Sequence, residues 1–269
     1  MSAPTCARTP KEHMGITMVI NFVAHAMRVL SQFGQDGVIK KAFDVIGTTN
    51  KYFVEFGSSG SDVGCGNTPH LRSYGFDGLL MDATTSPYEK PVIGKKYDVK
   101  TEFVTRENIC GLMEKYGVPK SFDFLSIDID GNDYWVLERV LREYSPRVVC
   151  VEANPYIPID RFRVQKYVPD FNWMGDNRFG ASFLSMVSLG KSFGYVAVAI
   201  CFCDVLFVKE SCLPKGTVVA NRDDVPGLLV GRPDADVHEL SQEQMDIWDG
   251  WDESMEGTKG NPPSLGVEL

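Results

Sequence analysis

The chain has no surplus of basic residues. Its 269 residues include 27 Lys and Arg against 36 Asp and Glu, which gives a formal net charge of -9 at pH 7. Non-specific binding to DNA or RNA needs a basic surface that neutralises the backbone phosphates. The composition therefore argues against nucleic acid as a partner and favours a small molecule as the ligand.

Long apolar runs are also absent. No stretch of about 18 uncharged apolar residues occurs, so we predict no membrane-spanning helix. The nearest approach, residues 14–30, is interrupted by His25 and Arg28. A secretory signal would need a basic leader and a small-residue cleavage site, whereas the residues after this segment continue a helical pattern. We expect an amphipathic helix that packs on the domain, with no membrane partner.

The cysteines form no metal-binding pattern. No CxxC pair and no Cys/His spacing typical of zinc sites occurs, so we expect no structural zinc. Several of the cysteines lie in apolar runs, which is typical of buried, reduced thiols in a cytoplasmic protein. The seven are Cys6, Cys65, Cys110, Cys150, Cys201, Cys203 and Cys212.

What the chain does contain is a glycine-rich stretch at residues 51–83. An apolar run that carries Glu55 ends at Gly57, passes through a glycine loop and a short helical segment, and leads to a second apolar run that ends in Asp82. Such glycines let the backbone approach a ligand. In nucleotide-binding α/β folds, an acid at the end of the next strand forms hydrogen bonds with the ribose hydroxyls. An ordinary tight turn is the alternative. The strict GxGxxG spacing is missing, which disfavours a nicotinamide cofactor.

Strands alternate with helices along most of the chain, and two final strands at 195–202 and 205–209 are joined by a short turn. This order predicts an α/β fold: a Rossmann-like, mainly parallel sheet with helices on both faces and an antiparallel C-terminal hairpin. Two helices are expected within residues 14–46, and the polar segment 31–37 between them is either a helix break or the rim of a site. The other expected strands are 97–104, 121–131 and 147–154, and the other expected helices are 106–116, 134–144 and 183–193.

We divide the chain into three parts. Residues 1–50 form an N-terminal helical extension, residues 51–210 form the Rossmann-like domain, and residues 211–269 form an acidic tail. The tail is expected to wrap the domain or to stay mobile rather than to form a second domain, because it is rich in acids, proline and glycine.

Polar residues mark the carboxyl end of each predicted strand. Ligands of parallel sheets bind outside these ends, so the polar residues are expected to converge on one site. The residues concerned are Glu55, Gly57, Asp82, Thr105, Asp128, Asp130, Glu152 and Asn154.

Asp128, Asp130 and Glu152 are the candidate catalytic residues. Alternate residues of a strand point to the same face, so Asp130 should accompany Asp128 and Asn154 should accompany Glu152. Oxygen ligands gathered in this way suit Mg²⁺ or another divalent cation, for which we predict Asp128, Glu152 and Asn154 as ligands. Alternatively, one carboxylate acts as a general base without a metal. Asp133 is expected to cap the next helix instead of joining the site.

Several stretches resemble the FkbM-like methyltransferases, which depend on S-adenosylmethionine. The most specific are SIDIDGNDYWV at 126–136 and VEANP at 151–155. SQFGQDGVI at 31–39, YFVEFG at 52–57 and GASFLSMVSLGKSFGY at 180–195 also match, and the resemblance covers roughly residues 31–209.

The resemblance implies a class I methyltransferase fold with a seven-stranded sheet. It also implies that the strand ends hold S-adenosylmethionine: Glu55, Gly57, Ser58 and Gly60 at its methionine portion, Asp82 and Ala83 at its ribose, Thr105 and Asn108 beside its adenine, and Asp128 near its sulfonium. The chain departs from the family pattern just before Gly60, where an acid is expected, and at Asp204, which replaces an asparagine of the closing hairpin.

We therefore predict a methyltransferase that acts on a small molecule, at oxygen. A metal-dependent enzyme that has the same scaffold but transfers no methyl group is the first alternative. A binding protein that has lost turnover is the second, and it is motivated by the two departures. The sequence leaves open whether the chain forms a homo-oligomer.

Overall fold

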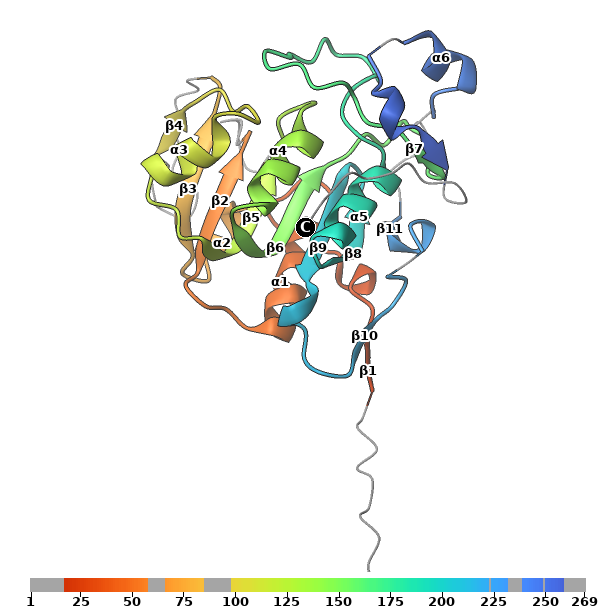
Figure 1. Ribbon diagram of the computed structural model, residues 1–269. Coiled ribbons are helices and arrows are strands. Elements are labelled where there is room, and N and C mark those ends of the chain that lie inside the picture. Colours follow the sequence, from red (N-terminus) through yellow and green to blue (C-terminus); the bar gives the residue numbers. More distant parts are fainter. Residues whose placement is uncertain are drawn as a thin grey trace, which may run out of the picture.

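The computed structural model describes residues 17–57, 66–84, 98–222, 224–231, 239–248 and 250–258. Its centre is an eight-stranded sheet with helices on both faces (Figure 1). The strands lie in the order β11-β8-β9-β6-β5-β2-β3-β4. The bounds are β2 Tyr52–Phe56, β3 Asp77–Asp82, β4 Val99–Thr101, β5 Ser121–Ile127, β6 Ser145–Glu152, β8 Tyr195–Cys201, β9 Asp204–Lys209 and β11 Leu229–Val230.

The sheet is mostly parallel, as predicted. Only β9 runs against its neighbours β6 and β8, so the expected hairpin is confirmed. Its turn is Phe202 and Cys203, one residue earlier than the predicted turn at Cys203 and Asp204. The sheet has eight strands where the resemblance implied seven, because β11, from the predicted tail, pairs in parallel with β8. The expectation of a mixed α/β fold is thus confirmed, and the strand count is corrected.

Helices cover the sheet in two groups, and the alternation of each strand explains why. Val54 and Phe56 of β2 face a core shared with α3 Ile109–Lys115, α4 Asp133–Leu141 and α5 Phe183–Ser192. Phe53 of the same strand faces the opposite core, where α1 Gln35–Ile46 and α2 Pro69–Arg72 pack. Since both faces are buried, the strands need apolar residues at nearly every position, which is typical of parallel sheets.

The helix expected over residues 14–30 is wrong for the part that the structure describes. Met18–Ile20 forms strand β1, which pairs in parallel with β10 at Thr217–Val219, and Val23–His25 forms the short 3-10 helix η1. The apolar spacing of this segment is compatible with a helix and with a strand. Pairing with β10, about 200 residues away, favours the strand. The second expected helix is confirmed as α1.

The segment after residue 210 packs on the domain. Besides β10 and β11, it contributes β12 Gly257–Thr258, which pairs with β7 Arg161–Phe162, and α6 Gln242–Ile247. Leu228 is fully buried in the main core. Short 3-10 helices complete the described elements: η2 Glu210–Cys212, η3 Pro226–Leu228 and η4 Glu253–Met255.

Two further expectations concern cysteine and membranes. Cys110, Cys150, Cys201 and Cys203 are buried free thiols, as predicted, while Cys6 and Cys65 lie outside the described residues. Among the described helices, none combines the length and the hydropathy that crossing a bilayer requires.

Candidate active site at the carboxyl edge of the sheet

The site lies where the direction of the sheet connections reverses. From β2 the chain moves to β3 and β4 on one side, whereas β5 and β6 lie on the other side of β2. Ligands of open α/β sheets bind at this switch point, outside the carboxyl ends of the strands. A cavity of about 520 Å³ opens there, lined by Gly57, Asp82, Asp128 and Glu152 from four neighbouring strand ends. Its volume suits a ligand the size of a nucleoside cofactor.

Gly57 is required by the close approach of two strand ends. Its φ is +69°, and its N–H donates to Met81 O at 3.0 Å. A Cβ at this position would lie 1.5 Å from the carbonyl oxygen of Asp128. Only glycine combines this backbone conformation with such proximity. Gly57 therefore allows the end of β2 to approach the chain at Asp128, next to the cavity.

Asp82 and Ala83 line the cavity where β3 ends. The Asp82 side chain is nearly buried, and its Oδ1 accepts hydrogen bonds from the backbone N–H and the hydroxyl of Thr84, each at 2.8 Å. These bonds fix the orientation of the carboxylate at the rim. Ser58 and Gly60, also predicted to bind the cofactor, lie outside the described residues.

Glu55 is buried and is not among the described cavity-lining residues. Its carboxylate accepts hydrogen bonds from the N–H of Asn67, at 2.7 Å, and from the hydroxyl of Thr68, both at the start of α2. Burial raises the pKa of Glu55, although these hydrogen bonds oppose the shift. In this structure Glu55 anchors the end of the loop.

Thr105 and Asn108 lie just before α3 and bind each other. The N–H of Thr105 donates to Asn108 Oδ1 at 2.8 Å, and the N–H of Asn108 donates to Thr105 Oγ1 at 3.2 Å. The cavity wall at this point consists instead of the preceding residues Glu102, Phe103 and Val104. Thr105 and Asn108, predicted to lie beside an adenine, are thus not among the described cavity-lining residues.

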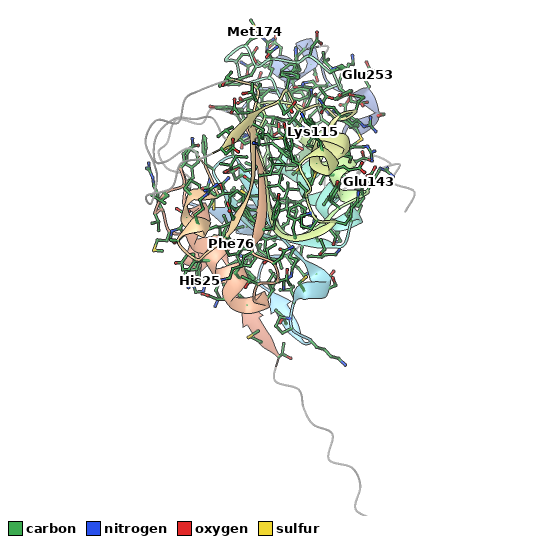
Figure 2. The ribbon with its side chains drawn as sticks, turned by 90° about the vertical axis from the view of Figure 1, so that its left-hand side faces the viewer. His25, Phe76, Lys115, Glu143, Met174 and Glu253 are labelled. Atoms are coloured by element: carbon green, nitrogen blue, oxygen red, sulfur yellow. The ribbon has the colours of Figure 1, made fainter. Side chains whose placement is uncertain are left out.

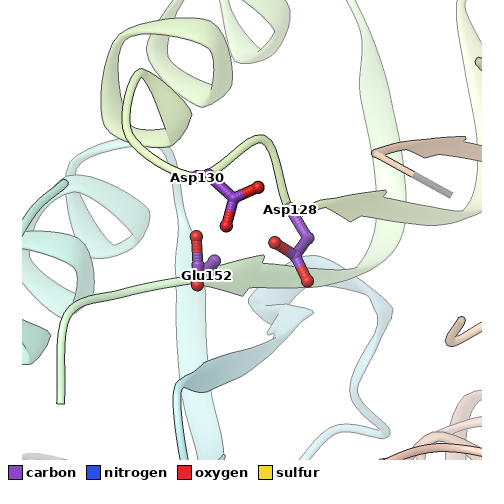
Figure 3. Close-up of side chains that lie close together, drawn as sticks. All are labelled: Asp128, Asp130 and Glu152. Carbon is purple, nitrogen blue, oxygen red and sulfur yellow. The ribbon is translucent and has the colours of Figure 1, made fainter. Parts of the chain in front are cut away.

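Three carboxylates meet in the cavity, as Figure 3 shows. Asp128 and Asp130 come from the loop that follows β5, and Glu152 ends β6. One oxygen from each lies within 4.8 Å of the others. Asp130 adopts a left-handed φ of +56°, which turns its side chain toward the other two. The structure thus brings together the three residues predicted to be catalytic.

Asn154, predicted as a metal ligand, lies apart from this group. Its Nδ2 donates to the carbonyl oxygens of Asn177 and Phe179, each at 2.8 Å, and its Oδ1 accepts from the N–H of Tyr156 at 2.8 Å. The amide therefore holds the connection after β6 in place. Asp130 occupies the position in the cluster that the sequence had suggested for Asn154.

Asp133 stabilises the loop that carries the two aspartates. Its carboxylate accepts from the N–H groups of Ile129 and Gly131, each at 2.8 Å. The predicted role of Asp133 outside the site is consistent with this geometry, except that the bonds close the loop before α4 and do not cap the helix. Burial raises the pKa of Asp133 to about 6.

Carboxylates dominate the electrostatics of the site. Burial, reinforced by the negative charges of Asp204 and Asp133, raises the pKa of Asp128 well above its ordinary range. Burial and the nearby Asp128 do the same for the pKa of Glu152. Among the described residues that line the cavity, none is Lys, Arg or His. The cavity therefore favours a ligand that carries positive charge.

Asp204 lies beside the cluster because β9 pairs with β6, which places it opposite Glu152. It is buried, and its Oδ2 accepts a hydrogen bond from the side chain of Gln35 in α1. Burial raises the pKa of Asp204 to about 6, although the bond from Gln35 opposes the shift. The segment 31–37 thus reaches the cavity, which Gln32 and Phe33 line, and this arrangement favours the rim of a site over a plain helix break.

Aromatic residues also line the cavity. Phe171 and Trp173 line the cavity from the loop at 168–179, whose exposed Met174 projects at the upper edge of the molecule (Figure 2). Phe33 packs against Phe202 at a centroid distance of 4.5 Å on another side. No local sequence pattern marks Phe202, which has a φ of +56° in the β8–β9 turn and lines the cavity.

No protein-family model and no curated protein matches this chain. The resemblance to the FkbM-like methyltransferases stays a prediction, and a function has to be argued from the geometry of the cavity.

Proposed function

We propose that the chain is an S-adenosylmethionine-dependent methyltransferase that acts on a small molecule, at oxygen. One observation carries the proposal: a cavity at the switch point of the sheet is lined by Gly57, Asp82 and Asp128 from three adjacent strand ends. The five strands β4-β3-β2-β5-β6 follow the order of a nucleotide-binding half and its continuation. The antiparallel hairpin of β8 and β9 supports the same fold family.

The residues of the cavity fit this cofactor in charge and in position. S-adenosylmethionine carries a sulfonium and an ammonium group, and the described wall contains carboxylates without a basic side chain. Asp82 is held at the end of β3, where a ribose diol is bound in such folds. Gly57, Asp82, Ala83 and Asp128 would hold the cofactor, with Glu55 fixing Asn67 and Thr68 at the start of α2.

The bound cofactor would supply an electrophilic methyl group. The protein's part is to exclude water, align the acceptor hydroxyl and receive its proton. Asp128 and Glu152 are placed for the last task, because burial favours their protonated forms and so makes each a stronger base when it is ionised. Asp130 is the exposed member of the group. The acceptor would lie against Phe171 and Trp173.

Calorimetric titration with S-adenosylmethionine and S-adenosylhomocysteine tests the proposal. We expect both to bind, because they share the ribose and adenine groups that the strand ends would hold. If neither binds, with or without Mg²⁺, the methyltransferase assignment fails.

The second candidate is a metal-dependent enzyme on the same scaffold that transfers no methyl group. The convergence of three carboxylates within 4.8 Å favours this candidate, because these carboxylates could bind a metal ion whether or not S-adenosylmethionine binds. Cation binding without any binding of S-adenosylmethionine or S-adenosylhomocysteine would select this candidate.

A further inference from the structure

The three carboxylates of Asp128, Asp130 and Glu152 form a set of oxygen ligands on rigid supports. Glu152 is the last residue of β6, and Asp128 directly follows the neighbouring strand β5. The loop that carries Asp130 is closed by the two hydrogen bonds to Asp133. The chosen oxygens lie within 4.8 Å of one another. Adjacent ligands in the octahedral shell of Mg²⁺, each about 2.1 Å from the ion, are about 3.0 Å apart, so the three oxygens have to draw together when the ion binds.

Glu152 supplies an independent sign of a ligand. It is 8% exposed, and its Oε2 is buried without a hydrogen-bond partner among the residues that the structure describes. It points toward Asp128 and Asp130 (Figure 3). A buried carboxylate oxygen is costly to leave unpaired. Across the antiparallel pair, Asp204 Oδ1 is likewise buried without a partner. Among the described residues, neither of these two oxygens has a compensating donor.

We infer that Asp128, Asp130 and Glu152 bind a divalent cation of the Mg²⁺ or Mn²⁺ class. The ligand set contains carboxylate oxygen without nitrogen or sulfur, which suits such hard cations better than zinc. The cation neutralises the cluster, a task for which the described wall of the cavity offers no Lys, Arg or His.

The coordination geometry also defines the acceptor. Octahedral coordination leaves about three positions open when three carboxylates bind through one oxygen each. All three residues line the cavity, so these positions face its interior. An acceptor with two adjacent oxygens, such as a diol or a hydroxy acid, fits them. This part of the inference rests on the proposed methyltransferase function, whereas the cation site does not.

Manganese binding to the chelator-treated protein, measured by calorimetry without S-adenosylmethionine, tests the site. We expect saturable binding of one Mn²⁺ and at least tenfold weaker binding for Glu152→Gln and Asp130→Asn. Asp160→Asn is the matched control, because Asp160 is an exposed acid outside the cavity. Unchanged affinity in folded Glu152→Gln, or no binding by the wild type at about 1 mM Mn²⁺, would overturn the site. Thermal unfolding of each variant establishes that it is folded.

Water-proton relaxation of the Mn²⁺ complex tests the open positions. Enhanced relaxation shows that exchangeable water binds the cation and leaves room for an acceptor. A complex without such water has a closed coordination shell, which would overturn the role in acceptor binding. Failure to bind S-adenosylmethionine while Mn²⁺ binds would instead overturn the methyltransferase and leave the cation site standing.

Discussion

At the scale of single residues, Asp82 gives the most direct test of the cofactor site. Replacing Asp82 with alanine removes a nearly buried carboxylate from the rim of the cavity. We expect S-adenosylmethionine to bind more weakly by about 1 to 3 kcal/mol, the loss typical of a charged hydrogen bond. Calorimetry measures the change. Asp77→Ala, at the opposite end of the same strand, is the control and should bind as the wild type does.

Gly57 and Gly47 form a matched pair for testing the close contact under the cavity. Both have a positive φ, +69° and +66°, but a Cβ at Gly47 meets nothing within 4 Å, whereas one at Gly57 collides with Asp128 O. We expect Gly47→Ala to lower the free energy of unfolding by about 1 to 2 kcal/mol, from backbone conformation alone. Gly57→Ala should cost more than about 3 kcal/mol, because the collision adds to it. Equal losses in urea unfolding would contradict the described contact.

Asp204→Asn tests the charge next to the cluster. The pKa of Asp204 is raised to about 6 in the folded state, so the folded protein binds this proton more tightly than the unfolded chain does. Its contribution to stability is therefore complete below about pH 4 and is lost as the pH rises through about 6. Asparagine does not titrate. We expect the variant to gain about 1 to 3 kcal/mol over the wild type between about pH 4 and about pH 8, as measured by urea unfolding. A constant difference would contradict the shift.

The sequence allowed the acids of the site to be predicted because each follows an apolar run. Asp82, Asp128 and Glu152 stand at the ends of strands that the pattern alone locates, and parallel strands bring such ends to one edge. Asn154 shares this signal, yet its partners are carbonyls of the loop at 177–179, which no local pattern connects to it. Whether a residue at a strand end binds a ligand or holds a loop in place therefore depends on side-chain partners that are distant in the sequence.

At the scale of elements, the loop at 168–179 forms a wall of the cavity. Trp173 lines the cavity and is 46% exposed, so a ligand bound there should change its fluorescence. We expect S-adenosylmethionine to alter the tryptophan emission of the wild type and to have much less effect on Trp173→Phe. Trp135, whose Nε1 donates to Gln165 O, is not among the cavity-lining residues. Trp135→Phe should thus retain the change, and its loss there would place the ligand elsewhere.

Elements with strong local signals were predicted well, and those that depend on remote partners were not. The helix α5 is capped by Ser182, whose hydroxyl accepts from the N–H of Ser185, and the chain turns away after the helix at Gly194, which has a left-handed φ of +78°. These signals are local. By contrast, β1 and β11 are short strands whose identity comes from pairing with β10 and β8. Their own residues could equally have formed a helix or a loop.

At the scale of the whole molecule, the segment after residue 210 is part of the domain. Leu228 lies in the main core with no exposed surface. We expect Leu228→Ala to lower the free energy of unfolding by about 2 to 5 kcal/mol, as for other buried leucines. Val218→Ala, at a position that is 44% exposed, should change it by no more than about 0.5 kcal/mol. A small effect of Leu228→Ala in urea unfolding would show that this segment is dispensable.

The parallel pair of β1 and β10 also sets an order of events during synthesis. The ribosome releases β1 before most of the sheet exists, and β10 follows about 200 residues later. At about 5 to 20 residues per second, roughly 10 to 40 s pass before the partner strand emerges. Ile20 is buried in the finished protein, and during that time its partner in β10 is not yet available. The growing chain thus carries an exposed strand edge near its beginning, which a chaperone that binds nascent chains is well placed to cover.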